Sequence, residues 1–254
     1  MTIEIFLVGV GTGNPRHITL QAVKQLKSAD ILIIPRKDNN KSDLANLRHQ
    51  ICKELLGDEC PPLFEFDLPP RNNEKTYLES VDEWHDAIAE IWTDCIENAQ
   101  KALKRRLNSV GLLIWGDPSL YDSSLRITKR LKPSTHVTII PGITSFQALT
   151  AAHKITVNEI GQPFIITTGR QIANFGFPEG INTAIIMLDG NCTFKTLEQK
   201  RYHIWWGAYL GMEHEILIEG RLAEVSDMII KARKNAREIH GWIMDTYMLR
   251  KKYS

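Results

Sequence analysis

The chain has 254 residues, and its 31 Lys and Arg against 30 Asp and Glu leave a formal net charge of +1. This balance gives no electrostatic ground for a polyanion-binding surface, so nucleic acid is not expected as a partner. With 43% hydrophobic residues, 24% charged residues, 16 Gly and 11 Pro, the composition excludes a disordered or collagen-like chain. A chain of this length is expected to form one large domain or two smaller ones.

The apolar runs are short, as at residues 31–34 and 184–188, and none approaches the roughly 18 residues that a membrane span needs. Residues 1–5 include an acid where a signal peptide would be basic. The four cysteines form no Cys-x-x-Cys pair and are too few for a disulfide scaffold. We therefore expect a soluble cytoplasmic protein with free thiols and no membrane partner.

The N-terminal third reads as strand, turn and helix. Residues 3–8 predict a buried strand, and the glycine cluster 9–13 follows it. Asn14-Pro15 is typical of a helix N-cap with proline at N1, and the helix it opens leads to a β-branched strand at 31–34. This succession predicts a parallel sheet. Further helices are predicted at 43–56 and 74–107, and further strands at 63–66 and 110–115.

Two later turns repeat this pattern. Gly116-Asp117-Pro118 follows strand 110–115 and, with Asp117 as N-cap, predicts a helix to about residue 131. A strand at 137–140 ends at Pro141-Gly142, and Thr144 with Gln147 then forms a capping-box pattern that opens a helix. Later strands are predicted at 164–167, 184–188, 203–209, 215–219 and 239–244, with helices near 194–200 and 222–235. The polar break at Lys132-Pro133-Ser134 predicts two domains, 1–133 and 134–254.

All three turns are expected at the carboxyl ends of strands, where open α/β sheets bind ligands. Glycines let the backbone approach a ligand closely, and helix starts offer unpaired N–H donors. The first cluster does not complete Gly-x-Gly-x-x-Gly, because Asn14 occupies the third glycine position, and no Gly-x4-Gly-Lys-Ser/Thr occurs. Dinucleotide-binding and P-loop interpretations therefore lose their main support.

Three stretches together resemble the tetrapyrrole (corrin/porphyrin) methyltransferases: residues 8–15 with 18–22, Gly116-Asp117-Pro118 and residues 141–145. They occur in the order that the family has and, with Ala29-Asp30, span much of the chain. The resemblance implies an α/β fold of two domains, an N-terminal mostly parallel sheet flanked by helices and a C-terminal mixed sheet with helices. It also implies a homodimer, and a cleft between the domains that binds S-adenosylmethionine and releases S-adenosylhomocysteine. No metal is implied.

The resemblance assigns cofactor contacts position by position. Leu188 occupies a position where relatives often have methionine, and leucine there preserves an apolar contact with the cofactor. The residues implied to touch S-adenosylmethionine are Thr12, Trp115, Gly116, Asp117, Thr144, Ser145, Leu188, Tyr209, Leu210 and Gly211. Asp117 is either an attraction for the cationic cofactor or an N-capping residue.

Four further segments, 41–52, 81–88, 206–212 and 241–247, resemble the family members that act in cobalamin (vitamin B12) biosynthesis on C1 of precorrin-5. The implied reaction methylates C1 and releases acetate to give precorrin-6A. Such a tetrapyrrole carries many carboxylates, which cationic side chains would bind. Candidates for these contacts are Arg16, His17, Arg36, Lys37, Arg71 and Arg170.

Removal of the acetyl group requires a base-activated water, and His85, Tyr209 and Asp245 are the candidates by chemistry. His85 is equally explained as a helix histidine packed beside Trp84. The same architecture serves methylation of other precorrin positions, of the diphthamide precursor of elongation factor 2, and of ribosomal RNA. A binding module that holds S-adenosylmethionine without turnover is the alternative from a different class.

Overall fold

The computed structural model describes residues 2–36, 42–70, 76–132 and 134–252. The chain divides into two compact units, Met1–Thr144 and Ser145–Ser254. This division lies after the predicted boundary at 133/134. The reason is strand β5 (Thr135–Ile140), which pairs with β1 (Ile3–Gly9) and so completes the first sheet instead of opening the second.

The first unit is built on a five-stranded sheet in the order β3-β2-β4-β1-β5, and all four strand pairs are parallel. Its remaining strands are β2 (Ile31–Pro35), β3 (Leu63–Phe66) and β4 (Ser109–Ile114). Every residue of β4 is buried, as expected for a parallel strand that is covered on both faces. The predicted mostly parallel N-terminal sheet is confirmed.

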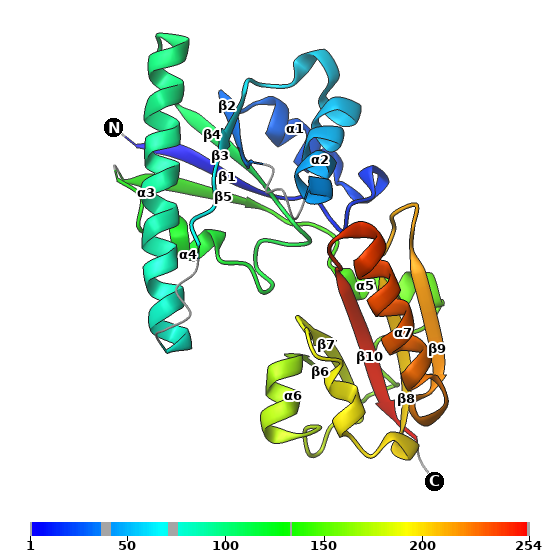
Figure 1. Ribbon diagram of the computed structural model, residues 1–254. Coiled ribbons are helices and arrows are strands. Elements are labelled where there is room, and N and C mark those ends of the chain that lie inside the picture. The colour runs from blue at the N-terminus through cyan, green and yellow to red at the C-terminus, as the bar shows by residue number, and fades with distance from the viewer. Residues whose placement is uncertain (1, 37–41, 71–75, 133, 253–254) are drawn as a thin grey trace. The chain divides into compact units, whose positions relative to one another are not determined.

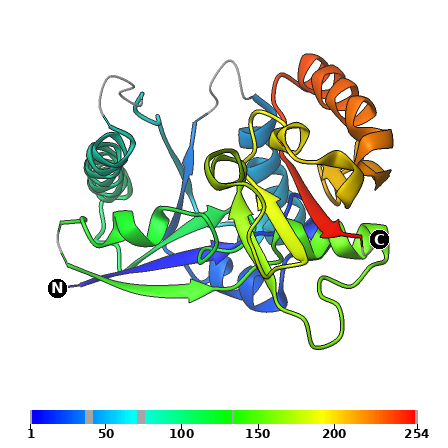
Figure 2. The same cartoon turned by 90° about the horizontal axis from the view of Figure 1, so that it is seen from below.

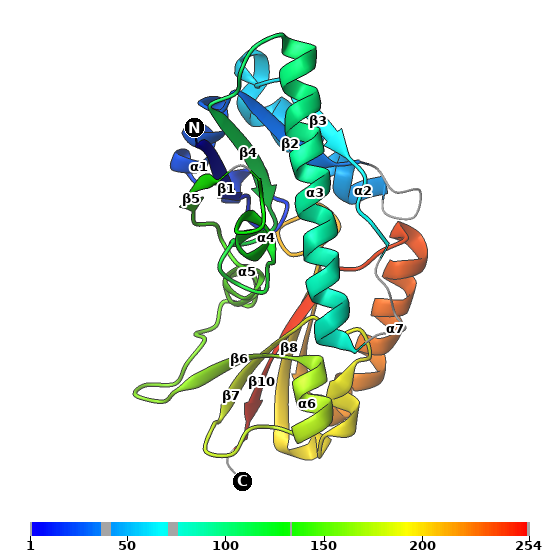
Figure 3. The ribbon, with the colours of Figure 1, turned by 90° about the vertical axis from the view of Figure 1, so that its left-hand side faces the viewer.

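Helices cover both faces of this sheet (Figure 1). Ile5 and Leu7 of β1 pack with the face under α3, while Phe6 and Val8 pack with the opposite face. The alternation follows from the two-residue period of a strand. Figure 3 views the unit from the α3 side, and Figure 2 shows α3 nearly end-on. The helices are α1 (Leu20–Lys27), α2 (Ser42–Ile51), α3 (Tyr77–Leu103) and α4 (Ser124–Thr128), with a π-helical turn at Cys52–Leu56 and 3-10 turns at Pro15–His17 and Gly57–Glu59.

The second unit contains a mixed sheet in the order β6-β7-β10-β8-β9. Among the described neighbouring strands of this sheet, β6 and β7 pair in parallel and the other three pairs are antiparallel. The predicted mixed C-terminal sheet is therefore confirmed. Its strands are β6 (Phe164–Thr168), β7 (Thr183–Met187), β8 (Tyr202–Ala208), β9 (Ile216–Arg221) and β10 (Asp245–Lys251).

Alternating residues of this sheet face two different sets of helices. Met248 packs with Leu149 of α5. Its neighbour Tyr247 packs edge-on against Phe194, at a ring-centroid distance of 5.3 Å. The helices are α5 (Ser145–His153), α6 (Gly169–Phe175) and α7 (Leu222–His240), with 3-10 turns at Thr193–Thr196 and Gln199–Arg201. None of the described helices is long and apolar enough to cross a membrane.

Several predicted helix ends are wrong for local reasons. Asn14 caps only the 3-10 turn, accepting from Arg16 N at 2.9 Å, and Thr19 caps α1 instead. The helix predicted from Pro118 to 131 begins only at Ser124, because Tyr121 has a left-handed φ of 51°.

In the second unit, α7 continues to His240 and ends at Gly241, whose φ is 74°. The strand predicted at 239–244 therefore begins later, at Asp245. Residues 194–200 form 3-10 turns in place of the predicted helix, and α6 was not predicted from the sequence.

At the amino-terminal edge of the first sheet, Asp30 joins three segments. Its Oδ2 accepts hydrogen bonds from Asn108 N at 2.6 Å and Ser109 N at 3.0 Å, and its Oδ1 lies 2.6 Å from Arg105 Nη1. Burial alone would raise the pKa of the Asp30 carboxyl, but the hydrogen bonds from Arg105, Asn108 and Ser109 hold that pKa below its ordinary value. The ionised carboxylate therefore stabilises the fold.

We expect Asp30→Asn to lower the free energy of unfolding by about 1 to 3 kcal/mol near neutral pH, because charge-assisted hydrogen bonds are lost. A folded-state pKa below the unfolded value gives stability that is present above the unfolded pKa and lost as pH falls through the folded one. Urea unfolding at several pH values should show the difference shrinking with acid. Asp58→Asn, at an exposed aspartate of the same unit, is the control; equal losses in both variants would contradict the role of Asp30.

Candidate functional site

The three loops singled out in the sequence follow three neighbouring strands. Strands β4, β1 and β5 are adjacent and parallel, so their carboxyl ends share one edge of the first sheet. We call residues 10–14 the first loop, 115–118 the second and 141–144 the third. Their clustering at this edge is the placement that open α/β sheets use for ligands.

Glycine backbones lock the three loops together. Gly11 and Gly116 form an isolated antiparallel bridge, with Gly116 N donating to Gly11 O at 2.7 Å. A Cβ at Gly142 would lie 2.1 Å from Gly116 O, and a Cβ at Gly9 would lie 2.6 Å from Gly142 N. Any side chain at Gly9 or Gly142 would therefore force the loops apart.

Asp117 fixes the second loop to the third. Its Oδ2 accepts a hydrogen bond from Gly142 N at 2.9 Å, and its Oδ1 accepts from Ser119 N at 2.8 Å and from the Ser119 hydroxyl. Burial would raise the pKa of the Asp117 carboxyl, but the bonds from Ser119 and Gly142 outweigh it and keep the pKa low. Asp117 therefore acts as a cross-link between loops, and the predicted N-cap role at Pro118 is wrong because no helix starts there.

The first loop is closed by the turn that follows it. Thr12 is buried, and its Oγ1 lies 3.5 Å from Nδ1 of His17. Arg16, from the same 3-10 turn, is exposed. His17 therefore packs onto the loop, whereas Arg16 remains accessible to a ligand.

Two of the expected cofactor contacts carry buried polar atoms without a partner. Trp115 Nε1 in the first unit and Ser145 Oγ in the second are buried and lack a hydrogen-bond partner among the described residues. Thr144, between them in the chain, is also buried. Buried polar groups are nearly always hydrogen-bonded, so both atoms could bond a polar ligand. Trp92 Nε1 in the core under α3 likewise has no partner among the described residues, so a missing partner by itself does not define a site.

The expected cofactor contacts in the second unit differ in whether a side chain or only the backbone could contact a ligand. Leu188, directly after β7, has a left-handed φ of 54° and a 66% exposed side chain. Leu210 is buried and packs in the cluster of Leu149 and Met248, so only its backbone could face a ligand. Gly211 N donates to Glu215 Oε2 at 2.6 Å.

Tyr209 has a structural role in the second unit and does not fit the role of a catalytic base. Its side chain is fully buried, and its hydroxyl donates to Trp242 O at 2.6 Å and lies 3.3 Å from Ala236 O. The ring packs in a tilted orientation against His214 and edge-on against His240. The hydroxyl therefore ties the end of α7 to the segment after β8.

Asp245 is likewise committed to an internal ion pair. Its Oδ2 lies 3.0 Å from Arg233 Nε and accepts from Trp206 Nε1 at 3.0 Å. Burial raises the pKa of the Asp245 carboxyl, while Arg233 and Trp206 act in the opposite direction. Because both groups are buried together, removing either one would leave the other charge unpaired. The geometry therefore favours a structural role over the predicted role as base.

Asp189 extends this network. Tyr247 hydroxyl donates to Asp189 Oδ2 at 2.7 Å, Thr193 N donates to the same oxygen at 2.6 Å, and Arg233 Nη2 donates to the Asp189 carbonyl at 3.2 Å. Sequence reasoning did not identify this buried network, because its members are spread over residues 189–247. It fixes the turn that carries Leu188.

His85 lies on α3 and is 3% exposed. Its Nε2 is buried and has no hydrogen-bond partner among the described residues, while its ring lies 6.0 Å from the Trp84 ring. Burial lowers the pKa of His85, as do the nearby Arg130 and Arg126, so the neutral imidazole is favoured. The titratable atoms of Tyr209 and Asp245 are hydrogen-bonded within the chain. Of the three predicted bases, only His85 has a titratable atom without a hydrogen-bond partner in the described part of the chain.

The other cationic residues predicted to contact the substrate differ in their surroundings. Arg36 forms ion pairs with Asp67 at 3.3 Å and Glu65 at 3.7 Å, and Arg170 lies exposed at the start of α6. Lys37 and Arg71 lie outside the described residues.

Sequence reasoning missed one arginine. Arg48 of α2 stacks over the Trp115 ring, with its Cζ 4.8 Å from the ring centroid. On an amphipathic helix an arginine is usually solvated, so periodicity gave no signal. Its place in segment 41–52 was the only available indication.

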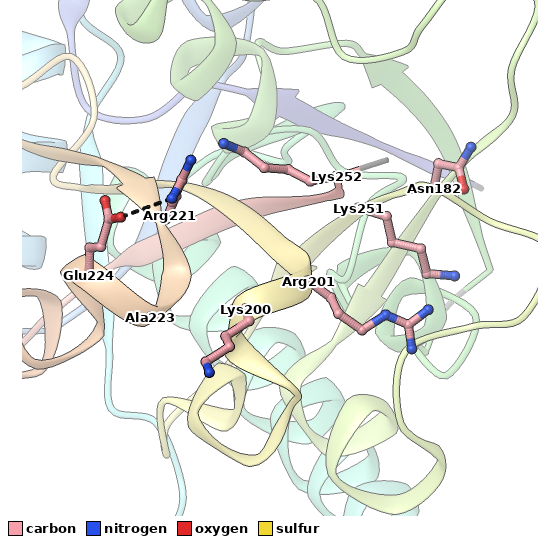
Figure 4. Close-up of a pocket in the computed structure, with 8 residues that line it drawn as sticks. All are labelled: Asn182, Lys200, Arg201, Arg221, Ala223, Glu224, Lys251 and Lys252. Carbon is pink, nitrogen blue, oxygen red and sulfur yellow. Dashed lines mark ion pairs between the residues drawn. The ribbon is translucent and has the colours of Figure 1, made fainter. Parts of the chain in front are cut away.

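A cationic hollow of about 820 Å³ lies at the other end of the second sheet (Figure 4). It is lined by Asn182, Lys200, Arg201, Arg221, Ala223, Glu224, Lys251 and Lys252. These residues flank the start of β8 and the end of β10, whereas Leu188 and Gly211 follow the carboxyl ends of β7 and β8. The length of a strand, roughly 20 Å, separates the two ends. The hollow is therefore distinct from the expected cofactor contacts at Leu188 and Gly211 in the same unit. Within the described part of the chain, no three His, Cys, Asp or Glu side chains are grouped to hold a metal ion.

Comparisons with known proteins agree with this geometry. Precorrin-6A synthase [deacetylating] from Sinorhizobium sp. is 44% identical over 98% of this chain and 95% of its own length. A cobalamin synthesis related protein from Corynebacterium diphtheriae has 34% sequence identity and a TM-score of 0.81, covering 99% of both chains. Uroporphyrin-III C-methyltransferase from Thermus thermophilus, solved with S-adenosylhomocysteine, shares the fold at a TM-score of 0.55 and 17% identity, covering 97% of both chains.

The family model for Tetrapyrrole (Corrin/Porphyrin) Methylases matches residues 4–226, which include all three loops and most of the second unit. The glycine-locked loops, the two α/β units and these relatives agree with one another. The chain belongs to the tetrapyrrole (corrin/porphyrin) methylase family.

Proposed function

We propose that this chain is an S-adenosylmethionine-dependent C-methyltransferase of cobalamin biosynthesis that methylates precorrin-5 at C1 and releases acetate, giving precorrin-6A. The observation that carries the proposal is the 44% identity to precorrin-6A synthase [deacetylating] over nearly the full length of both chains. The locked loops support it, since the sequence keeps each glycine that the loop contacts require.

The cofactor is proposed to bind at the three loops. Thr12, Trp115 and Thr144 would line its site in the first unit, and Ser145 and Leu188 in the second. Trp115 Nε1 and Ser145 Oγ are donors without partners among the described residues, as a site awaiting a polar ligand requires. When bound, S-adenosylmethionine supplies an activated methyl group on a sulfonium. The protein's own contribution is to hold the acceptor carbon in line with the sulfur–methyl bond and to exclude water.

The substrate's carboxylates need cationic partners. Among the predicted contacts that the structure describes, Arg16 and Arg170 have exposed side chains. His85 is the remaining candidate for activating the water that attacks the acetyl carbonyl, since its neutral form is favoured and Nε2 has no partner among the described residues. The oxygen of that water leaves in acetate, so the reaction consumes S-adenosylmethionine, precorrin-5 and water.

Other functions of the same fold are less well supported. Cobalt-precorrin-2 C(20)-methyltransferase from Methanocaldococcus jannaschii is 25% identical over 88% of this chain and 90% of its own length, well below the 44% above. The net charge of +1 disfavours an RNA substrate. A homodimer stays a prediction of the resemblance, which light scattering on the purified protein would check.

Incubation with precorrin-5 and S-adenosylmethionine should yield S-adenosylhomocysteine and acetate in equal amounts, because one C1 site undergoes both changes. Chromatography of the cofactor products and an enzymatic acetate assay measure the two yields. Methylation without acetate would assign the chain to another precorrin position. Binding of S-adenosylhomocysteine without any turnover would favour the non-catalytic module.

Gly142→Ala should abolish S-adenosylhomocysteine binding, because its Cβ would meet Gly116 O at 2.1 Å and separate the second loop from the third. Calorimetric titration measures this, with circular dichroism to verify folding. Gly161→Ala is the matched control, since Gly161 has a φ of 68° and no neighbour within 4 Å of an added Cβ. That control should lose about 1 kcal/mol of stability and keep its affinity. Unchanged affinity in Gly142→Ala would exclude the loops as the cofactor site.

A further inference from the structure

Arg48 is held in a fixed orientation beside the second loop. Its guanidinium lies over the Trp115 ring at 4.8 Å, and its Nε is 3.4 Å from the carbonyl oxygen of Leu113, near the end of β4. Stacking on an indole and a hydrogen bond at Nε leave the outer edge of the guanidinium, with its two terminal nitrogens, as the donor face. No hydrogen bond from these terminal nitrogens is found among the described residues.

Three other arginines of the first unit, Arg36, Arg105 and Arg130, form ion pairs with carboxylates, whereas among the described residues Arg126 bonds only the backbone oxygen of Asp122. Arg105 binds Asp30 at 2.6 Å, and Arg130 binds Asp82 and Asp86. Arg48 has no carboxylate within ion-pair distance among the described residues, although it is partly buried. Burial lowers the pKa of Arg48 to about 10, and the charge of Asp122 opposes this only in part. The folded chain therefore holds a partly buried guanidinium that has no carboxylate within ion-pair distance among the described residues.

An uncompensated, desolvated cation is unfavourable unless something else pairs with it. A planar guanidinium with a free forked edge matches a carboxylate in bidentate geometry. The Trp115 ring sets the plane of that fork, and Trp115 also opens the second loop. A carboxylate brought to this loop by a ligand would complete the missing ion pair.

We propose that Arg48, oriented by Trp115, forms a carboxylate-binding subsite at the second loop. The carboxylate comes either from a side chain of the tetrapyrrole or from the amino-acid end of the cofactor. The inference rests on the proposed function, because that function brings both molecules to these loops. It assigns a binding residue to α2, which none of the predicted contacts includes.

Calorimetric titration of the full chain tests this subsite with three probes: S-adenosylhomocysteine, 5′-methylthioadenosine, which lacks the amino-acid carboxylate, and uroporphyrin III, a stable tetrapyrrole polycarboxylate. The variants are Arg48→Met and Arg48→Gln. The matched control is Arg105→Met, which removes an arginine from the opposite edge of the same sheet. Circular dichroism and thermal melting verify that each variant is folded.

Arg48→Met should lose about tenfold or more in affinity for one carboxylate ligand, as expected for a charge-assisted bidentate contact. Weaker S-adenosylhomocysteine binding with unchanged methylthioadenosine binding identifies the cofactor's carboxylate. Weaker uroporphyrin binding with unchanged S-adenosylhomocysteine binding identifies the substrate's carboxylate. Arg105→Met should bind all probes like the wild type.

The inference is overturned if folded Arg48→Met binds S-adenosylhomocysteine and uroporphyrin within twofold of the wild type, or if Arg105→Met loses affinity equally. Should Arg48→Met fail to fold, the same criteria apply to Arg48→Gln, which retains a polar head. A wild-type chain that binds neither S-adenosylhomocysteine nor uroporphyrin would instead contradict the proposed function, and with it this subsite.

Discussion

The close approach of three backbones at Gly9, Gly116 and Gly142 is the constraint on which the rest of the first unit depends. Each of these glycines follows, or ends, one of three adjacent parallel strands, and an added Cβ at Gly9 or Gly142 would overlap a neighbouring backbone atom. Asp117 adds a carboxylate cross-link from the second loop to the third. Rigid loops of this kind can present a ligand with fixed donors, because their conformation is already set by the fold.

Some buried polar groups of this chain are paired within their own unit, and others are not. In the second unit, Asp189, Arg233 and Asp245 satisfy one another and leave little to a ligand. In the described part of the first unit, Arg48 has no carboxylate partner beyond its hydrogen bond to Leu113 O, and Trp115 Nε1 has no hydrogen-bond partner. A buried polar network whose groups are all hydrogen-bonded rigidifies a core. A buried polar group without a partner is a position where a ligand could supply the missing bond. This contrast separates the structural carboxylates from the groups available for chemistry.

The family resemblance indicates the three loops of the first unit as the cofactor site, whereas the cationic hollow lies in the second unit. The cationic hollow at the far end of the second sheet is large, but its lining residues are surface lysines and arginines near the starts of β7 and β8. The loops at the carboxyl edge of the first sheet carry the glycines that close backbone contact requires, together with the buried residues Thr12 and Thr144. The chemistry of these residues therefore favours the loops as the proposed cofactor site, whatever the volume of the hollow.

The sequence by itself determined the strand, turn and helix order of the first unit, the three loops and the family resemblance, because these depend on residues close together in the chain. Only the tertiary structure decided that Tyr209 and Asp245 are internal, since their partners Trp242 and Arg233 become neighbours only when α7 packs on the sheet. The same holds for β5, which joins β1 instead of the second unit, and for Arg48, whose lack of a carboxylate partner within the described residues no local pattern reveals. Patterns among residues close in the sequence determine local backbone geometry. Whether a charged side chain finds a partner depends instead on groups that folding brings together from distant parts of the chain.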